Sequence, residues 1–176
     1  MANNWAIVIG IDHYRDWPAG ILNGAVRDAV EMRNWLLDRS GGAVDPGQLY
    51  TLLSARPESS LGIDPDDFED PSKDAVTDLI GTLAGQVNAG AESFFFYFAG
   101  HGLSNMGGPL GHDDAIVFSD FSPNHPDKSL HTEHIFAQLG AMLFNEEFFF
   151  IDACRDAPWT GPKPNFGRFP TELMPD

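Results

Sequence analysis

The sequence predicts an α/β fold in which helices cover both faces of a mainly parallel sheet. Four short runs of residues are almost entirely apolar, which is typical of strands that are buried on both faces of a parallel sheet. Amphipathic stretches separate these runs, so strands and helices alternate along the chain. No internal repeat or linker divides the 176 residues, and this length suits one domain with one substantial core.

The four apolar runs are predicted as the strands of this sheet. Each is bounded by polar or turn-forming residues, and they occupy residues 5–11, 48–53, 93–99 and 148–151. The third run leads directly into His101 and the fourth into Cys154, the only cysteine of the chain. Open α/β sheets bind their ligands at the carboxyl ends of the strands, so both residues are expected at the functional edge.

Three amphipathic helices are predicted between the strands. The first covers residues 25–37, where apolar residues recur at steps of three and four, and the second runs from residue 74 to about 88. The third is predicted to begin with Thr132 as its N-cap and to lead into the final strand.

Two segments are predicted as loops. Residues 54–72 are rich in proline, serine and aspartate, and their acidic cluster is interpreted as a solvated surface because it lacks the glycine and distal glutamate of an EF-hand. Residues 103–129 are rich in glycine, proline, asparagine and aspartate, and they predict a long loop. Within it, residues 115–118 are expected to form a small hairpin arm over the site.

Composition limits the classes of partner. The formal net charge of −16 disfavours nucleic acid and anionic membranes, whose binding depends on lysine and arginine, and it favours cationic substrates. A single cysteine forms no intrachain disulfide, and the first residues do not resemble a secretory signal. The longest apolar runs are far shorter than the roughly 20 residues that cross a bilayer. These features predict a cytoplasmic protein.

Cys154 and His101 together suit nucleophilic catalysis. A thiol of ordinary pKa, about 8.5, is only partly ionised near neutrality, and a nearby imidazole can activate it and later protonate a leaving amine. The backbone amides of Gly102 and Cys154 would then face the oxyanion of an acyl transfer. Alone, a cysteine after an apolar strand is more commonly an inert buried residue, and the pairing with His101 favours the dyad.

Four short motifs strengthen this interpretation: GIDHY at residues 10–14, RDA at 27–29, YFAGHG at 97–102 and DACR at 152–155. In this order they resemble motifs of the caspase-like cysteine peptidases, the clan of caspases, metacaspases and their prokaryotic homologues. The resemblance covers residues 5 to 155. It implies a three-layer α/β/α sandwich of the caspase-like fold and a cysteine endopeptidase with Cys154 as nucleophile and His101 as general acid and base.

The resemblance also implies a substrate preference. Caspases have glutamine two residues before the cysteine and use arginines to hold a substrate aspartate, whereas this chain has Asp152 there and Leu22 near the first expected arginine. Metacaspases have aspartate at the positions of Asp28 and Asp152, which would line a pocket for Arg or Lys. Ala99 replaces the serine that is usual in the histidine motif. Cleavage after Arg or Lys is therefore expected.

Only four strands are predicted, fewer than a complete caspase-like domain contains. The resemblance implies that residues 1–157 are the large, catalytic portion and that a small-subunit portion completes the sheet. Residues 158–176 form a Pro- and Gly-rich tail or inter-subunit linker, in which Lys163 and Arg168 are candidate autoprocessing sites. A role in regulated proteolysis, defence or cell death is what the family suggests.

Two alternatives remain at this point. The first is a catalytically silent caspase-like module for dimerisation or scaffolding, although a scaffold needs neither Cys154 nor His101. The second concerns cofactors: the dyad needs none and no metal ligands are predicted, but calcium binding at Asp113, Asp114 and Asp120 is an alternative because some metacaspases bind calcium at related acidic positions.

Overall fold

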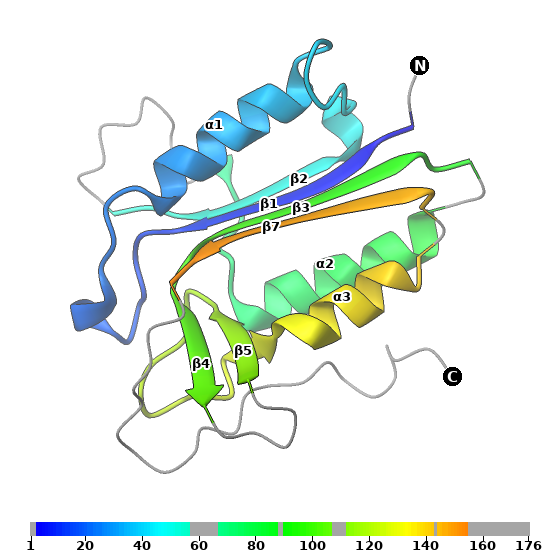
Figure 1. Cartoon of the computed structure of the whole chain (residues 1–176). Helices are drawn as coiled ribbons and strands as arrows, with labels where there is room; N and C mark the ends of the chain where they lie inside the picture. The colour runs from blue at the N-terminus through cyan, green and yellow to red at the C-terminus, as the bar shows by residue number, and fades with distance from the viewer. Residues whose placement is uncertain (1–2, 57–66, 88–89, 107–111, 143, 155–176) are drawn as a thin grey trace.

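The computed structural model describes residues 3–56, 67–87, 90–106, 112–142 and 144–154. Its central sheet has four parallel strands in the order β2-β1-β3-β7. They are β1 (Trp5–Ile11), β2 (Leu49–Ser54), β3 (Ser93–Gly100) and β7 (Glu146–Ala153). Helix α1 (Ala25–Leu37) covers one face, and α2 (Lys73–Gln86) and α3 (Thr132–Gly140) cover the other (Figure 1). The predicted three-layer α/β/α architecture is confirmed.

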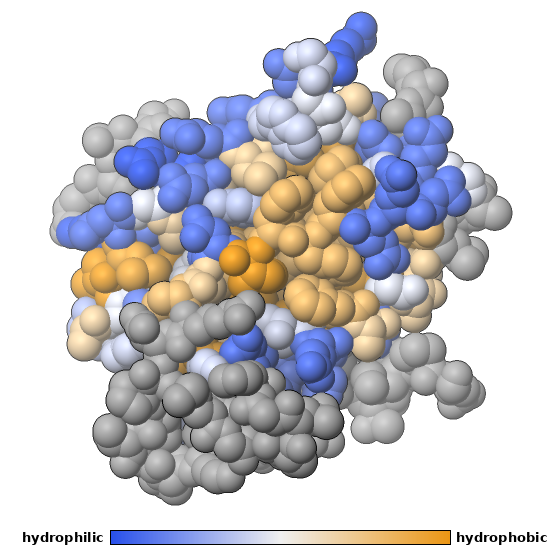
Figure 2. Space-filling model, in the orientation of Figure 1, coloured by the Kyte–Doolittle hydropathy of each residue, from blue (hydrophilic) through white to orange (hydrophobic). Residues whose placement is uncertain are grey.

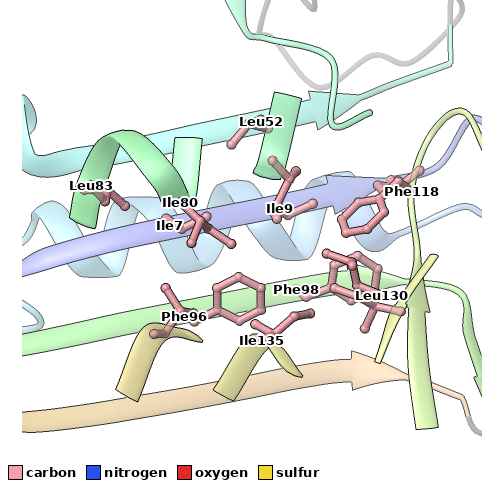
Figure 3. Close-up of a cluster of buried hydrophobic side chains, with 14 of the residues drawn as sticks. Ile7, Ile9, Leu52, Ile80, Leu83, Phe96, Phe98, Phe118, Leu130 and Ile135 are labelled. Atoms are coloured by element: carbon pink, nitrogen blue, oxygen red, sulfur yellow. The ribbon is translucent and has the colours of Figure 1, made fainter. Parts of the chain in front are cut away.

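Alternation along β3 divides the core into two layers. Phe96 and Phe98 face α2 and α3 and pack with Ile7 and Ile9 of β1 (Figure 3). Tyr97 and its neighbours at odd positions face α1 instead. Since successive side chains of a strand point to opposite faces, a strand that is buried on both sides must be apolar throughout. This explains why the strands of the sheet could be recognised as unbroken apolar runs.

A second, three-stranded antiparallel sheet corrects the prediction of a long loop over residues 103–129. It consists of β4 (Gly102–Met106), β5 (His112–Val117) and β6 (Ser129–His131) in that order. Figure 1 shows β4 and β5 next to the carboxyl ends of β3 and β7. Residues 115–117 of the expected arm at 115–118 are therefore the end of a longer strand, and Phe118 follows it. These strands are short and mostly polar, so they lack the apolar signature of the central sheet.

The helix starts differ in how they are capped. Ser72 caps α2, because its hydroxyl accepts a hydrogen bond from the amide of Ala75 at 3.3 Å. The prediction that Thr132 is an N-cap is wrong: His131 occupies that position without a side-chain cap. Instead, the Thr132 hydroxyl donates to the carbonyl of Asp114 at 3.2 Å and so fastens α3 to β5. Within the described ranges, no helix is both long enough and apolar enough to span a membrane.

Candidate active site

His101 and Cys154 follow the ends of two neighbouring strands. The parallel register of β3 and β7 pairs Ala99 with Asp152 and Gly100 with Ala153. His101 and Cys154 each occupy the next position along their strands, and adjacent strands lie about 4.8 Å apart. The Cys154 side of the site is open, since this free cysteine is exposed. The structure therefore brings the two predicted dyad residues to the same edge of the sheet.

The imidazole of His101 is held by the segment that follows β1. Its Nε2 lies 2.9 Å from the carbonyl oxygen of Gly20, and its ring centroid lies 4.9 Å from that of Trp17. A carbonyl only accepts hydrogen bonds, so this contact assigns the proton of the neutral ring to Nε2. The lone pair of Nδ1 is then left to take a proton from another group.

Backbone contacts fix the position of His101 as well. Its amide donates to the hydroxyl oxygen of Tyr14 at 2.8 Å, and Tyr14 is fully buried beneath it. Burial raises the pKa of Tyr14 well above its ordinary value of 10.0, so the phenol stays protonated. Gly20 has no room for a side chain, because a Cβ there would lie 2.4 Å from the Trp17 ring.

Asp12 closes the segment that carries Gly20. Its carboxylate oxygen Oδ1 accepts hydrogen bonds from the amides of Gly24 and Ala25, each at 3.0 Å, at the start of α1. Its own carbonyl accepts from the amide of Leu22 at 2.9 Å. Asp12 is only 5% exposed, so these contacts replace its hydration. The carboxylate thus holds both ends of the loop that reaches over His101.

Sequence reasoning did not assign roles to Gly20, Trp17 or Asp12. The contact to His101 is made by the carbonyl of Gly20, a group that every residue type has, so the identity of this residue does not reveal its role. Asp12 belongs to the GIDHY motif, and its buried position directly after a strand was the signal available.

The pH dependence of activity should reflect the surroundings of His101. Burial lowers the pKa of His101 below its ordinary 6.5, and the bond to the Gly20 carbonyl opposes this more weakly. The neutral imidazole, the form that accepts a proton, then persists to lower pH, so the acid limb of kcat/KM should lie below 6.5. Trp17→Leu should hydrate the ring and move this limb upward towards 6.5, with a smaller change on the alkaline plateau. An acid limb that stays in place in the variant would contradict this assignment.

Gly102 packs against the main chain of the cysteine. A Cβ at this position would lie 2.5 Å from the carbonyl oxygen of Cys154 and 3.1 Å from the Cβ of Ala153. The structure therefore joins Gly102 and Cys154, the two residues predicted to supply oxyanion amides, although their role as donors stays a prediction. Only glycine allows β4 to pass this close to the end of β7.

Gly102→Ala should therefore displace the backbone of Cys154. We expect a loss of about 1–3 kcal/mol in the free energy of unfolding and a fall of about a hundredfold in kcat/KM, because a shift of about 1 Å misplaces the nucleophile. Gly85→Ala in α2 is the matched control, since a Cβ there meets nothing within 4 Å. Thermal unfolding and peptide turnover would measure both effects. Equal behaviour of the two variants would show that the close contact has no consequence.

Asp28 and Asp152 both lie near the hydroxyl of Tyr97. The pKa of Tyr97 is raised to about 12, mainly by burial and to a smaller extent by the charges of Asp152 and Asp28, in that order. Asp152 is exposed and lies next to the buried Ala99 in the strand register. The structure thus places both predicted pocket residues on the α1 side of the sheet, with Asp152 two positions before Cys154 on β7, and their role in a substrate pocket stays a prediction. Leu22 contributes to the apolar core instead.

Arg27 already pairs with Asp28. Its Nε and Nη2 both donate to Oδ1 of Asp28 at 3.2 Å, and both side chains are partly exposed. The contact shows that a guanidinium can reach this carboxylate. A substrate arginine would have to compete with Arg27 for it, and the weak coupling of exposed ion pairs makes this exchange easy.

The aspartates suggested as calcium ligands have different surroundings. Asp120 accepts from the amide of Lys73 at 3.0 Å and pairs with Lys128 at 3.1 Å. Asp114 lines a pocket beside Cys154, and the side chain of Asp113 is not described. Among the described residues, no three His, Cys, Asp or Glu side chains form a group that could hold a metal ion. Calcium binding stays a prediction. Lys163 and Arg168, the candidate processing sites, lie outside the described residues.

A parallel α/β sheet with a cysteine and a histidine at its carboxyl edge is an arrangement that suits cysteine-dependent hydrolysis. The model of the caspase domain matches residues 3–168, so the chain belongs to the caspase-domain family of peptidases. It is 39% identical over 163 residues to a probable protease of a Desulfuromonadales bacterium, covering 91% of this chain and 19% of that protein. The crystal structure of protein GSU0716 from Geobacter sulfurreducens has a similar fold, with a TM-score of 0.59 and 19% identity over 89% of this chain and 52% of the other. The chain thus spans about a fifth of that relative and about half of that structure.

Proposed function

We propose that the chain is the catalytic part of a cysteine endopeptidase that cleaves peptide bonds after Arg or Lys. The observation that carries this proposal is the placement of Cys154 beside His101, whose Nε2 is held by the Gly20 carbonyl. This arrangement leaves Nδ1 as the proton acceptor. The match to the caspase-domain family supports the same reaction class.

The dyad performs the reaction in two stages. Nδ1 of His101 takes the proton of the Cys154 thiol, and the sulfur attacks the carbonyl carbon of the scissile bond. The amides of Gly102 and Cys154 donate to the resulting oxyanion. His101 then returns its proton to the leaving amine, which leaves a thioester. A water molecule, deprotonated by the same imidazole, hydrolyses the thioester and restores the thiol.

Asp28 and Asp152 give the preference for a basic residue. Two carboxylates on the α1 side of the dyad match the charge and the forked donors of a guanidinium. The formal net charge of −16 also attracts cationic peptides. Fluorogenic peptides that differ only in Arg, Lys or Asp before the reporter amide would test this. We expect turnover of the Arg and Lys peptides. Preference for Asp would refute the pocket assignment, and no turnover of any peptide would refute the enzymatic function.

The edge of the sheet at β7 supports the proposed small-subunit portion. Among the strands that the structure describes, β7 pairs only with β3, and its residues Phe148 and Phe150 are 39% and 40% exposed. Figure 2 shows a hydrophobic patch in the middle of this face of the molecule. Unpaired edges and large exposed apolar patches are typical of surfaces that another segment covers. We propose that a further strand, from a longer form of the protein or from a second polypeptide, pairs with β7.

The peptide assay should accordingly be run on the chain alone and on the chain together with the segment that follows it in a longer form. Protection of the β7 amides from hydrogen exchange in the second sample would support strand addition. Unchanged exchange would contradict it, whether or not the peptides are cleaved. Lys163 and Arg168 are proposed as processing sites between the two portions, and cleavage there by the active protein but not by Cys154→Ala is the expected result.

A further inference from the structure

A cavity lies between α1 and β2, and β2 is the outer strand of the central sheet at the end opposite β7 (Figure 1). The volume of the cavity is about 210 Å³. The described residues that line it come from α1, β2, the turn before β2 and the segment before α2: Arg33, Leu37, Pro46, Leu49, Thr51 and Phe68. These do not include the dyad, the predicted oxyanion donors or the acidic pair. The cavity is therefore separate from the candidate active site.

Two polar residues of this lining occupy positions that face the core. Arg33 lies four residues after the buried Ala29 and three before the buried Leu36, and residues at these steps share one face of a helix. Thr51 lies two residues before the buried Leu53 on β2, so both side chains point to the α1 face. A charge and a hydroxyl thus interrupt the apolar pattern of two facing elements and line the same cavity.

Both polar groups lack a partner. The Nε atom of Arg33 and the Oγ1 atom of Thr51 are shielded from solvent and have no hydrogen-bond partner in the described part of the chain. Leaving a buried donor unpaired costs free energy, so nearly all such groups in folded proteins are satisfied by the protein, by water or by a ligand. The cavity beside these two atoms provides the space for a partner.

The guanidinium of Arg33 lies against the ring of Phe68. Its Cζ atom is 5.9 Å from the ring centroid, within the range of a cation–π contact. The residue after Phe68, Glu69, forms a parallel bridge with Leu52 of β2, and its carbonyl accepts from the amide of Leu53 at 3.0 Å. The wall of the cavity and its cation are thus in place before a ligand binds, which reduces the ordering cost of binding.

The lining defines the chemistry of the ligand. Arg33 is the one charged residue among the described lining residues, and its planar guanidinium matches a carboxylate through paired hydrogen bonds. The formal net charge of −16 opposes a ligand with several negative charges. The remaining walls are apolar and suit a hydrocarbon body: Leu37, Pro46, Leu49 and Phe68. A cavity of about 150 Å³ holds benzene, so about 210 Å³ accommodates a ring of that size together with a carboxylate.

We propose that this cavity binds a small monocarboxylic acid with an apolar body of about six carbon atoms, whose carboxylate meets Arg33 and Thr51. The dyad takes no part in this site, so the site does not depend on the proposed peptidase function. Water alone is the alternative occupant. An ordered water needs 2–4 polar partners, whereas the described lining offers two polar side chains against four apolar ones. This balance favours the acid.

A titration with benzoate tests the inference. Methyl-labelled protein would be titrated with benzoate and with benzyl alcohol, a neutral molecule of similar size, and followed by NMR. We expect benzoate to shift the methyl signals of Leu37, Leu49 and Thr51, with an affinity about tenfold or more above that of benzyl alcohol because its bonds to Arg33 are charge-assisted. The methyl signal of Ala153, beside the nucleophile, should stay in place. Shifts with neither compound would leave water as the occupant and overturn the inference, and equal affinities would overturn the role of the carboxylate.

Variants of the two polar residues test the contacts of the carboxylate. Arg33→Gln should lower the affinity for benzoate by about tenfold or more, and Thr51→Val, which keeps the shape of the side chain, by about threefold. Arg39→Gln is the matched control, because Arg39 is exposed just after α1 and does not line the cavity. Equal losses in Arg33→Gln and Arg39→Gln would show that only net charge matters and would overturn the site.

Thermal unfolding separates a ligand site from a structural arginine. Without benzoate, Arg33→Met should unfold at the temperature of the native chain or above it, because it removes an unpaired buried donor and keeps an apolar stem. Saturating benzoate should raise the unfolding temperature of the native chain but not that of Arg33→Met. A lower unfolding temperature of Arg33→Met, with no upward shift of the native chain by benzoate, would make Arg33 a structural residue and overturn the inference.

Discussion

Cys154→Ala is expected to abolish peptide hydrolysis, and His101→Ala to lower kcat/KM by about a thousandfold or more. Without the sulfur there is no nucleophile and no thioester. Without the imidazole, the thiol loses its base and the leaving amine loses its acid, each of which is worth about 100- to 10,000-fold. Because Cys154 and His101 act as one unit, the double variant should be no less active than Cys154→Ala alone.

The measurement is kcat/KM for an arginine peptide, with active-site titration by a thiol-directed reagent. His125→Ala is the matched control, since His125 is exposed and lies in a turn whose described hydrogen bonds are made by its backbone. Cys154 is exposed, so its replacement should change the free energy of unfolding by no more than about 0.5 kcal/mol. Unchanged turnover by a folded Cys154→Ala would exclude the dyad. Loss of turnover by His125→Ala would mean that the assay detects general damage to the fold.

The central sheet and its three helices could be predicted from the sequence because the apolar pattern that forms each element recurs along its whole length. β1 and α1 begin and end at the predicted residues, Trp5–Ile11 and Ala25–Leu37. Burial on both faces demands continuous apolar residues in β1 and β3, and burial of one face demands the spacing of α1. The same apolar pattern continues from residue to residue within each element, so a few residues are enough to predict its type and extent.

The second sheet and the contacts that hold the His101 ring are not marked by any repeating residue pattern. β4 and β5 pair through backbone hydrogen bonds in a segment rich in Asn, Asp and Gly, a composition that is typical of loops. Gly20 acts through its carbonyl, and Thr132 has the residue type of a cap but bonds to the Asp114 carbonyl instead. These features depend on which segments meet in space, and local propensity does not encode that.

The candidate site falls between these cases. His101 and Cys154 could be predicted because both follow recognisable strands, and the strand order then brings them together. The placement of Asp28 near Asp152 was implied by family resemblance alone. A charged residue on an exposed helix turn has no local feature that distinguishes a binding residue from a solvated one.

Asp152→Asn and Asp28→Asn are each expected to lower kcat/KM for arginine peptides by about 10- to 30-fold. Removing one partner of a buried ion pair costs about 2–5 kcal/mol, but both carboxylates are partly exposed, which keeps the loss at the lower end. A tenfold change corresponds to about 1.4 kcal/mol. Asparagine keeps the shape and an acceptor oxygen, so the change isolates the charge. The double variant should lose most of the preference for Arg over a neutral residue.

Two further variants separate a specific pocket from the general negative field. Glu31→Gln removes an equal charge from the exposed side of α1. Because Glu31 raises the pKa of Tyr97 less than Asp28 does, we expect a much smaller loss in kcat/KM for arginine peptides. Arg27→Gln removes the guanidinium that now pairs with Asp28, and we expect it to raise kcat/KM for arginine peptides by lowering KM. Equal losses in Asp28→Asn and Glu31→Gln would show that only net charge matters. An unchanged KM in Arg27→Gln would mean that Asp28 does not meet the substrate, and the preference would then rest on Asp152, two residues before the nucleophile.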